Sequence, residues 1–214
     1  VVESAVMCTG APPVLMAKLL GAAAFLHESN TIPGRANRWL SPLVNTAFVG
    51  FVQAGLRLHN PSIRVTGTPV RAQFTPADAA SCRIALGLHP ERPVLLVTGG
   101  SQGASGINDL VSRALGILAL RLPALQYFHL TGAGDLEKTR AAYQARNCRA
   151  VVLPFLTEME LALGAATVAV SRAGASSLAE MAAMQLPAIL IPYPAAVDNH
   201  QFYNARAFME TGAA

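Results

Sequence analysis

The sequence predicts an α/β protein whose parallel sheets are flanked by helices, and three observations carry this prediction. Short apolar runs of strand length alternate with longer helical segments along the whole chain. Residues 94–97 are apolar at every position, which is typical of a parallel strand buried on both faces. Glycine-rich turns follow several of these runs, and glycine lets a backbone approach a ligand closely. Together these features indicate repeated βαβ units.

Each element is expected where its pattern is strongest. The expected strands are 23–26, 46–51, 64–66, 93–98, 126–131, 149–153, 167–171 and 188–191. The expected helices between them are 12–20, 33–40, 76–86, 104–122, 136–147, 158–163, 177–184 and 199–210. Pro33 and Pro76 lie where a first-turn proline is tolerated, and Thr75 is the expected N-cap of the helix at Pro76.

The composition predicts a folded protein with a mild positive charge. Hydrophobic residues make up 52% of the 214 residues, and 16 Lys and Arg against 12 Asp and Glu give a net charge of +4. This charge suits an anionic ligand or an anionic membrane surface. The arginines are scattered and are not interleaved with aromatic residues, so the composition does not favour nucleic acid as a partner.

No membrane-spanning segment or metal site is expected. The longest apolar stretch, 14–26, is interrupted by Lys18 and Gly21 and is shorter than the roughly 20 residues of a spanning helix. Cys8, Cys82 and Cys148 lack the spacing of metal ligands, which predicts reduced thiols in a cytosolic protein.

A domain boundary is expected near the Gly67-Thr68-Pro69-Val70-Arg71 segment, where a short strand ends and a new βα series begins. Residues 1–72 would form only half of a first α/β domain, and 73–214 most of a second one. The chain begins at Val1 without a signal peptide or an initiator Met, so we expect a fragment.

Four polar or glycine-rich loops follow predicted strands, at the edge where open α/β sheets bind ligands. They are 27–30 (His-Glu-Ser-Asn), 99–104 (Gly-Gly-Ser-Gln-Gly-Ala), 131–135 (Thr-Gly-Ala-Gly-Asp) and 171–177 (Ser-Arg-Ala-Gly-Ala-Ser-Ser). The second loop leads from a buried strand into a helix, and the unpaired N–H groups and dipole of that helix favour an anion. Its sequence matches neither the dinucleotide-binding motif nor a Walker loop. It therefore predicts a phosphate-binding site without specifying which phosphate-containing ligand is bound.

Several of these residues have two interpretations. Ser177 and Glu180 have the spacing of a capping box, or Glu180 accepts hydrogen bonds from a ribose diol beside a diphosphate at the helix N-terminus. Asp198 and Asn199 would cap a helix, or the polar segment 198–204 would bind sugar hydroxyls. His27 is either a structural histidine or part of a ligand site.

Taken together, the loops resemble the MurG family of glycosyltransferases over nearly the whole chain. The resemblance rests on segments 27–30, 67–71, 99–104, 171–175 with Glu180, and 198–201, in the family's order and approximate spacing. It implies a GT-B fold, two Rossmann-like domains with the first one incomplete. It also implies transfer of N-acetylglucosamine from UDP-N-acetylglucosamine to lipid I, the undecaprenyl-diphosphate-linked muramoyl pentapeptide, which makes lipid II for peptidoglycan.

Carried over by position, the resemblance assigns substrate-binding roles as follows. Ser101, with Gln102 and Gly103, would hold the diphosphate, and Arg71 would reach the diphosphate or the uracil side. Leu156 would border the uracil and Glu180 the ribose. Asn30 and Gln201 would contact N-acetylglucosamine, and His27 and Glu28 would lie toward the acceptor. The helix N-terminus would come from Gly174, Ala175, Ser176, Ser177, Leu178 and Ala179.

The resemblance implies a reaction that inverts the configuration at the anomeric carbon and uses neither a metal nor a cofactor. The resemblance places the general base in a glycine-rich loop upstream of Val1, so no catalytic base is assigned here and the fragment alone is expected to be inactive. Met7 stands where the family has an acceptor-side tyrosine. The family implies a peripheral protein on the cytoplasmic face of the plasma membrane, in contact with its anionic inner leaflet.

Three other functions remain open from the sequence alone. They are another GT-B glycosyltransferase acting on a lipid, a nucleotide-sugar epimerase, and a UDP-sugar binding module without turnover. An epimerase needs carboxylates around the sugar, and only Glu28, Asp135 and Asp198 lie in the proposed loops.

Overall fold

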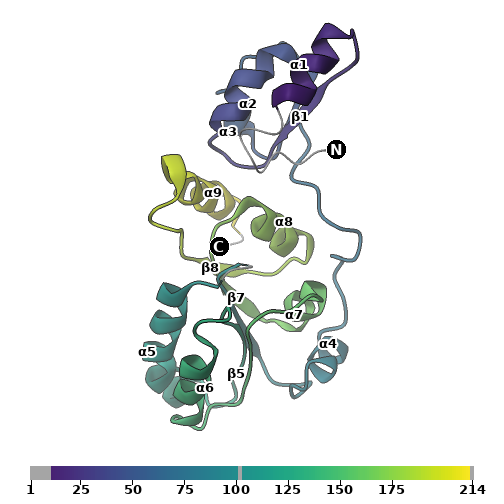
Figure 1. Cartoon of the computed structure of the whole chain (residues 1–214). Coiled ribbons are helices and arrows are strands. Elements are labelled where there is room, and N and C mark those ends of the chain that lie inside the picture. Colours follow the sequence, from purple (N-terminus) through teal and green to yellow (C-terminus); the bar gives the residue numbers. More distant parts are fainter. Residues whose placement is uncertain (1–10, 101–102, 213–214) are drawn as a thin grey trace.

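The computed structural model describes residues 11–100 and 103–212 and contains two parallel sheets (Figure 1). The first sheet has the order β1-β2-β3, with parallel pairing throughout. Its strands and the helices around them are α1 (Ala11–Leu19), β1 (Phe25–Glu28), α2 (Arg35–Leu40), η1 (Ser41–Leu43), β2 (Thr46–Val49), α3 (Val52–Gly55) and β3 (Ile63–Val65).

The second sheet has five parallel strands in the order β6-β5-β4-β7-β8. Its elements are α4 (Ala79–Ala85), β4 (Val94–Thr98), α5 (Ser105–Arg121), β5 (Gln126–Leu130), α6 (Leu136–Gln144), β6 (Ala150–Leu153), α7 (Met159–Ala165), β7 (Val168–Ser171), α8 (Ala175–Ala183), β8 (Ala188–Leu190), η2 (Val197–Asn199) and α9 (His200–Met209). Figure 1 shows α5 and α6 on one face of this sheet and α4 and α7 on the other.

The apolar run of β4 is buried because both faces of the sheet are covered. Val94 and Leu96 point into a core that includes Leu178 of α8, whereas Leu95 and Val97 point into a second core beneath α5 and α6. Alternate residues of a strand face opposite sides of the sheet, so both sets of β4 side chains lie in apolar surroundings between two helical layers. The first sheet has its own smaller core around Ala47 and Val49.

The structure confirms the α/β class with parallel sheets, and each predicted strand and long helix is present with ends shifted by a few residues. The predicted N-cap at Thr75 is wrong. The helix begins later, at Ala79, and Asp78 caps it by accepting a hydrogen bond from the Ser81 N–H at 2.8 Å. The short helix α3 and the two 3-10 turns were not predicted from the sequence, because three or four residues give no measurable periodicity.

Helix α9 is hydrogen-bonded to the loop that follows β1. Asn204 of α9 is fully buried, and its Oδ1 accepts hydrogen bonds from the N–H and the hydroxyl of Thr31, both at 2.9 Å. Its Nδ2 donates to Asn30 Oδ1 and to the Ala173 carbonyl. Arg38 of α2 also pairs with Asp198 at 2.9 Å. The boundary proposed between residues 72 and 73 stays a prediction.

Candidate functional site

The site lies where the strand order of the second sheet reverses. After β4 the chain moves outward to β5 and β6, and then returns to add β7 on the other side of β4. The loops that leave β4 and β7 therefore diverge to opposite faces, and this leaves a crevice at the carboxyl ends of the strands. Parallel α/β sheets bind their ligands at such a position.

A cavity of about 250 Å³ opens at this crevice. It brings together four of the residues that the resemblance assigns to substrate binding, namely Arg71, Leu156, Ser177 and Glu180. Its other lining residues are Thr98, Gly100, Leu130, Pro154, Phe155, Thr157, Met159, Leu163, Ser171 and Met181. The cavity is thus apolar along one wall and polar where the loops of β4 and β7 meet it.

The glycine loop after β4 packs tightly against the turn that follows β5. Gly103 has a φ of +74°, and a Cβ at this position would lie 2.3 Å from the Thr131 carbonyl oxygen. Any side chain here would push the two loops apart, so the glycine is required by close approach as well as by conformation. Ser101 and Gln102, the predicted diphosphate contacts in this loop, lie outside the described residues, as do Met7 and Cys8.

The N-terminus of α8 forms the opposite rim of the cavity. The helix begins at Ala175, and Gly174 occupies the N-cap without a side-chain hydrogen bond to the helix. The capping-box interpretation of Ser177 is therefore wrong, because Ser177 lies inside the first turn and lines the cavity instead. The first-turn N–H groups of Ala175, Ser176 and Ser177 have no acceptor within the helix and provide partial positive charge for an anion.

Two other residues predicted in this segment lie further along α8. The Leu178 side chain is 1% exposed in the core, and its N–H donates to the Gly174 carbonyl at 3.0 Å. Neither group is available to a ligand. Ala179 follows in the same helix and does not line the cavity. The ligand-facing part of α8 is therefore its first turn together with Glu180.

Glu180 and Arg71 are the charged groups of the cavity. Glu180 is half-buried, and this burial raises the pKa of its carboxyl above the usual value. The nearby Arg71 guanidinium opposes this shift without reversing it. Arg71 also stacks over the Phe74 ring, 4.9 Å from its centroid. Since Arg71 follows β3 and Glu180 lies in α8, the cavity draws on both sides of the predicted boundary.

The apolar wall comes from the loop after β6. Phe155 is 57% exposed, and Leu156 packs partly into the core. The four loops named from the sequence do not include this one, and the resemblance assigned only Leu156 within it, so Thr157 and the following Met159 were missed. Their signal was their place directly after a parallel strand of the second sheet, at the same edge as the loops that follow β4, β5 and β7.

Gln201 is oriented by a hydrogen bond to one end of its side-chain amide, and Asn30 by hydrogen bonds to both ends. Gln201 Oε1 accepts from the Tyr193 N–H at 2.9 Å, so its Nε2 is directed away as a donor. Asn30 accepts from Asn204 and donates to Glu28 Oε1 at 3.3 Å. Asn199, the N-cap of α9, has a φ of 54° and makes no side-chain capping bond. The simple capping interpretation of this segment therefore fails.

The two residues placed toward the acceptor have internal partners. His27 Nε2 lies 2.9 Å from the Gly67 carbonyl oxygen, as its structural interpretation predicts. Glu28 is 3% exposed, and its carboxylate accepts from the Asn30 and Gly34 N–H groups and from Asn37 Nδ2. Glu28 thus organises the loop after β1, and its acceptor role stays a prediction.

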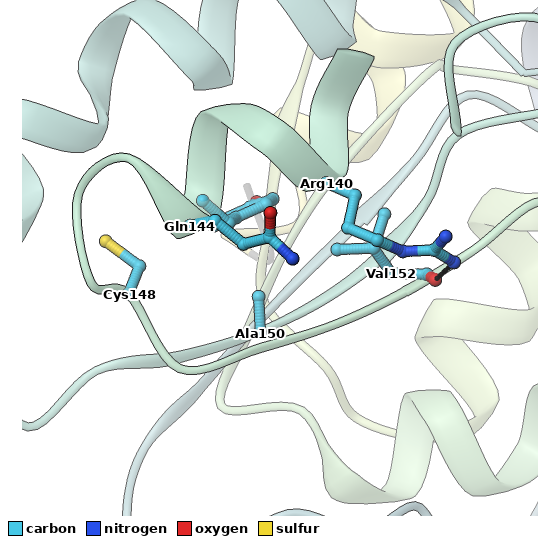
Figure 2. Close-up of a pocket in the computed structure, with 6 residues that line it drawn as sticks. Arg140, Gln144, Cys148, Ala150 and Val152 are labelled. Atoms are coloured by element: carbon cyan, nitrogen blue, oxygen red, sulfur yellow. Dashed lines mark hydrogen bonds between the residues drawn. The ribbon is translucent and has the colours of Figure 1, made fainter. Parts of the chain in front are cut away.

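A second, smaller cavity of about 180 Å³ lies between α6 and β6 (Figure 2). Arg140 and Gln144 come from α6, and Ala150 and Val152 from β6. None of the predicted site residues lines it. Within residues 11–100 and 103–212, no three His, Cys, Asp or Glu side chains come together in a way that would hold a metal ion.

The sequence of the second sheet decides the family. Residues 94–214 match the model of the glycosyltransferase family 28 C-terminal domain. The chain belongs to glycosyltransferase family 28. The matched residues begin at β4 and include the glycine loop, the cavity and α9, so the site described above lies largely within the family's C-terminal domain.

Curated relatives of this chain are UDP-N-acetylglucosamine--N-acetylmuramyl-(pentapeptide) pyrophosphoryl-undecaprenol N-acetylglucosamine transferases. The protein of Sorangium cellulosum is 41% identical over 96% of this chain, and 49% of its own length is covered. That of Carboxydothermus hydrogenoformans is 38% identical over 95% of this chain and 55% of its own length. The chain therefore spans about half the length of the curated relatives it matches.

Solved structures agree with this assignment. The crystal structure of Acinetobacter baumannii MurG matches with a TM-score of 0.72 and 30% identity, covering 95% of this chain and 55% of that one. A UDP-glucose: anthocyanidin 3-O-glucosyltransferase in complex with UDP matches with a TM-score of 0.60 at 16% identity, which supports the fold alone. The predicted family and GT-B architecture are confirmed.

Proposed function

We propose that the cavity binds the UDP part of UDP-N-acetylglucosamine. The observation that carries this proposal is the meeting of a half-buried carboxylate, an arginine, a glycine loop and a helix N-terminus in one cavity at the strand reversal. The relatives' names, which specify N-acetylglucosamine transfer from this donor, support the same choice.

Each part of the cavity suits one part of the nucleotide. The diphosphate would lie between the Gly103 loop and the first turn of α8, whose N–H groups have no acceptor within the helix. Glu180 would accept hydrogen bonds from the two ribose hydroxyls, and Phe155 with Leu156 would border the uracil. Arg71 would neutralise charge at the diphosphate or bind the uracil side.

The reaction we propose is transfer of N-acetylglucosamine to undecaprenyl-diphosphate-linked muramoyl pentapeptide, with inversion at the anomeric carbon. The acceptor hydroxyl forms the new bond to that carbon, loses its proton to a base, and UDP leaves with the bonding electrons. In this proposal the first-turn N–H groups and the dipole of α8 stabilise the leaving diphosphate, so neither a metal nor a cofactor is needed. Gln201 and Asn30 would orient the sugar.

We also propose a peripheral position on the cytoplasmic face of the plasma membrane, with helices α1 and α2 toward the anionic leaflet. Leu15 and Leu19 of α1 and Trp39 of α2 are 46%, 79% and 86% exposed. Helices α1 and α2 pack against each other (Figure 1), and Lys18 and Arg35 belong to the same pair of helices. Exposed apolar side chains beside basic ones suit binding to anionic lipid. In the described part of the chain, no helix is long and apolar enough to cross a bilayer.

The epimerase alternative is disfavoured by the state of its three candidate carboxylates. Glu28 is buried among internal donors, and Asp135 accepts a hydrogen bond from Asn108 at 2.9 Å. Asp198 is paired with Arg38. None is positioned to exchange protons with a sugar in the cavity.

Calorimetric titration with UDP tests the proposal. We expect binding by the wild-type chain, and we expect Glu180→Ala to weaken it by about 1–3 kcal/mol through loss of charged hydrogen bonds. Glu91→Ala is the matched control, because Glu91 is exposed and precedes β4 at the opposite end of the sheet. Equal UDP affinity in the wild type and Glu180→Ala would show that this cavity is not the nucleotide site.

A further inference from the structure

A buried chain of polar groups runs beneath the glycine loop and is not used by the function proposed above. His129 of β5 is fully buried, with Nδ1 3.0 Å from the Tyr143 hydroxyl and Nε2 2.9 Å from Asn108 Oδ1. Asn108 lies in the first turns of α5 and is 1% exposed. Its Nδ2 donates to the Thr131 carbonyl at 3.0 Å and to Asp135 Oδ2 at 2.9 Å.

The hydrogen bonds fix the direction of this chain. Both N–H bonds of Asn108 Nδ2 are used, so its Oδ1 is an acceptor and His129 Nε2 must carry the proton. Burial lowers the pKa of His129 to about 4, so the ring is neutral near pH 7 and its Nδ1 accepts from the Tyr143 hydroxyl. Burial also raises the pKa of Tyr143, which keeps that hydroxyl protonated. Every donor therefore points toward the Thr131–Asp135 turn.

That turn supports the glycine loop. Thr131 and Gly132 are the groups that a Cβ on Gly103 would strike, at 2.3 and 2.8 Å, so the position of the turn sets the position of the loop. Asp135 is also held by hydrogen bonds from Asn108 and Ser105, which lower the pKa of its carboxyl. Ser105 is the first residue of α5. The chain thus links the sheet interior to the end of the glycine loop that leads into α5.

We propose that Asn108, His129 and Tyr143 are positioning residues for the diphosphate loop, setting the Thr131–Asp135 turn against which Gly103 rests. This inference rests on the proposed nucleotide function. It predicts that a change in the chain weakens ligands that carry a diphosphate and leaves ligands without phosphate unaffected. A residue that only stabilised the fold would not distinguish the two kinds of ligand.

Two substitutions of His129 distinguish the contribution of ring nitrogen Nε2 from that of Nδ1. The amide nitrogen of Gln reaches the place of His Nε2, so His129→Gln keeps a donor toward Asn108. The shorter Asn reaches only the place of Nδ1, so His129→Asn loses that donor and leaves Asn108 Oδ1 unsatisfied. We expect His129→Asn to weaken UDP binding about tenfold, because a buried acceptor is left without its partner, and His129→Gln to weaken it much less.

The experiment titrates UDP and uridine into the wild-type chain and both variants. The expected result is a loss of UDP affinity in His129→Asn, uridine affinity unchanged in all three proteins, and rescue of UDP binding in His129→Gln. An equal loss for UDP and uridine, or no loss for UDP, would overturn the positioning role. Failure of the wild type to bind either ligand would instead overturn the proposed function and this inference with it.

Tyr143→Phe keeps the inference testable if His129→Asn does not fold. It removes one hydroxyl and keeps the ring, whose centroid lies 5.0 Å from that of Tyr127. We expect a loss of UDP affinity of about threefold, smaller than in His129→Asn because the removed group lies farther from the loop, with uridine affinity unchanged. UDP affinity equal to that of the wild type in this variant would contradict the inference.

Discussion

The buried, neutral His129 should make the protein lose stability as the pH falls from 6.5 toward 4. Burial lowers the pKa of this imidazole from 6.5 to about 4, with Asp135 opposing the shift. The unfolded chain therefore takes up a proton below pH 6.5 that the folded chain does not. Stability from this residue is complete above pH 6.5 and is lost as the pH falls through that range. The shift corresponds to about 2 kcal/mol between pH 8 and pH 5.

Urea unfolding of the wild type and His129→Gln at pH 8, 6 and 5 measures this contribution. Other titrating groups act equally in both proteins, so the difference between the two isolates the histidine. We expect the free energy of unfolding of the wild type to fall by about 2 kcal/mol more than that of the variant between pH 8 and pH 5. The same fall in both proteins would refute the assignment of a buried, neutral imidazole.

Three further substitutions test the packing around the site. Gly103→Ala should abolish UDP binding in a titration while the circular dichroism spectrum is kept, because its Cβ would meet the Thr131 carbonyl oxygen at 2.3 Å. Asn204→Ala should lower the free energy of unfolding in urea by about 1–3 kcal/mol, since the groups it bonds after β1 lose their partner. Glu28→Gln should lower it by a similar 1–3 kcal/mol, because an amide nitrogen would face backbone donors that now share a carboxylate. Unchanged unfolding curves in either of the last two would contradict the hydrogen bonds described here.

The fold was predictable because its elements have strong local signals. Residues 94–97 of β4 are apolar at every position since helices cover both faces of the sheet, and the glycine-rich turn that follows marks the end of the strand. Helix ends were less predictable. Thr75 and Ser177 both have the chemistry of a cap, yet Asp78 and Gly174 occupy the cap positions. The local sequence does not show which of several neighbouring residues occupies the N-cap of the helix.

The site was predictable in part, because parallel strands bring their carboxyl ends to one edge. Arg71, Leu156, Ser177 and Glu180 meet in the cavity as expected. The partners of buried polar groups were not predictable, because they depend on contacts between distant segments.

Asn204 and Thr31 are 173 residues apart. The partners of the buried His129 are Asn108 and Tyr143, 21 and 14 residues away. Neither spacing has a sequence signature.

A crystal structure of this chain with UDP tests the central claim most directly. The account predicts the diphosphate between the Gly103 loop and the first turn of α8, the ribose hydroxyls at Glu180, and the uracil against Phe155 and Leu156. UDP bound elsewhere, for example in the cavity between α6 and β6, would contradict the account, as would crystals that take up no UDP at saturating concentration.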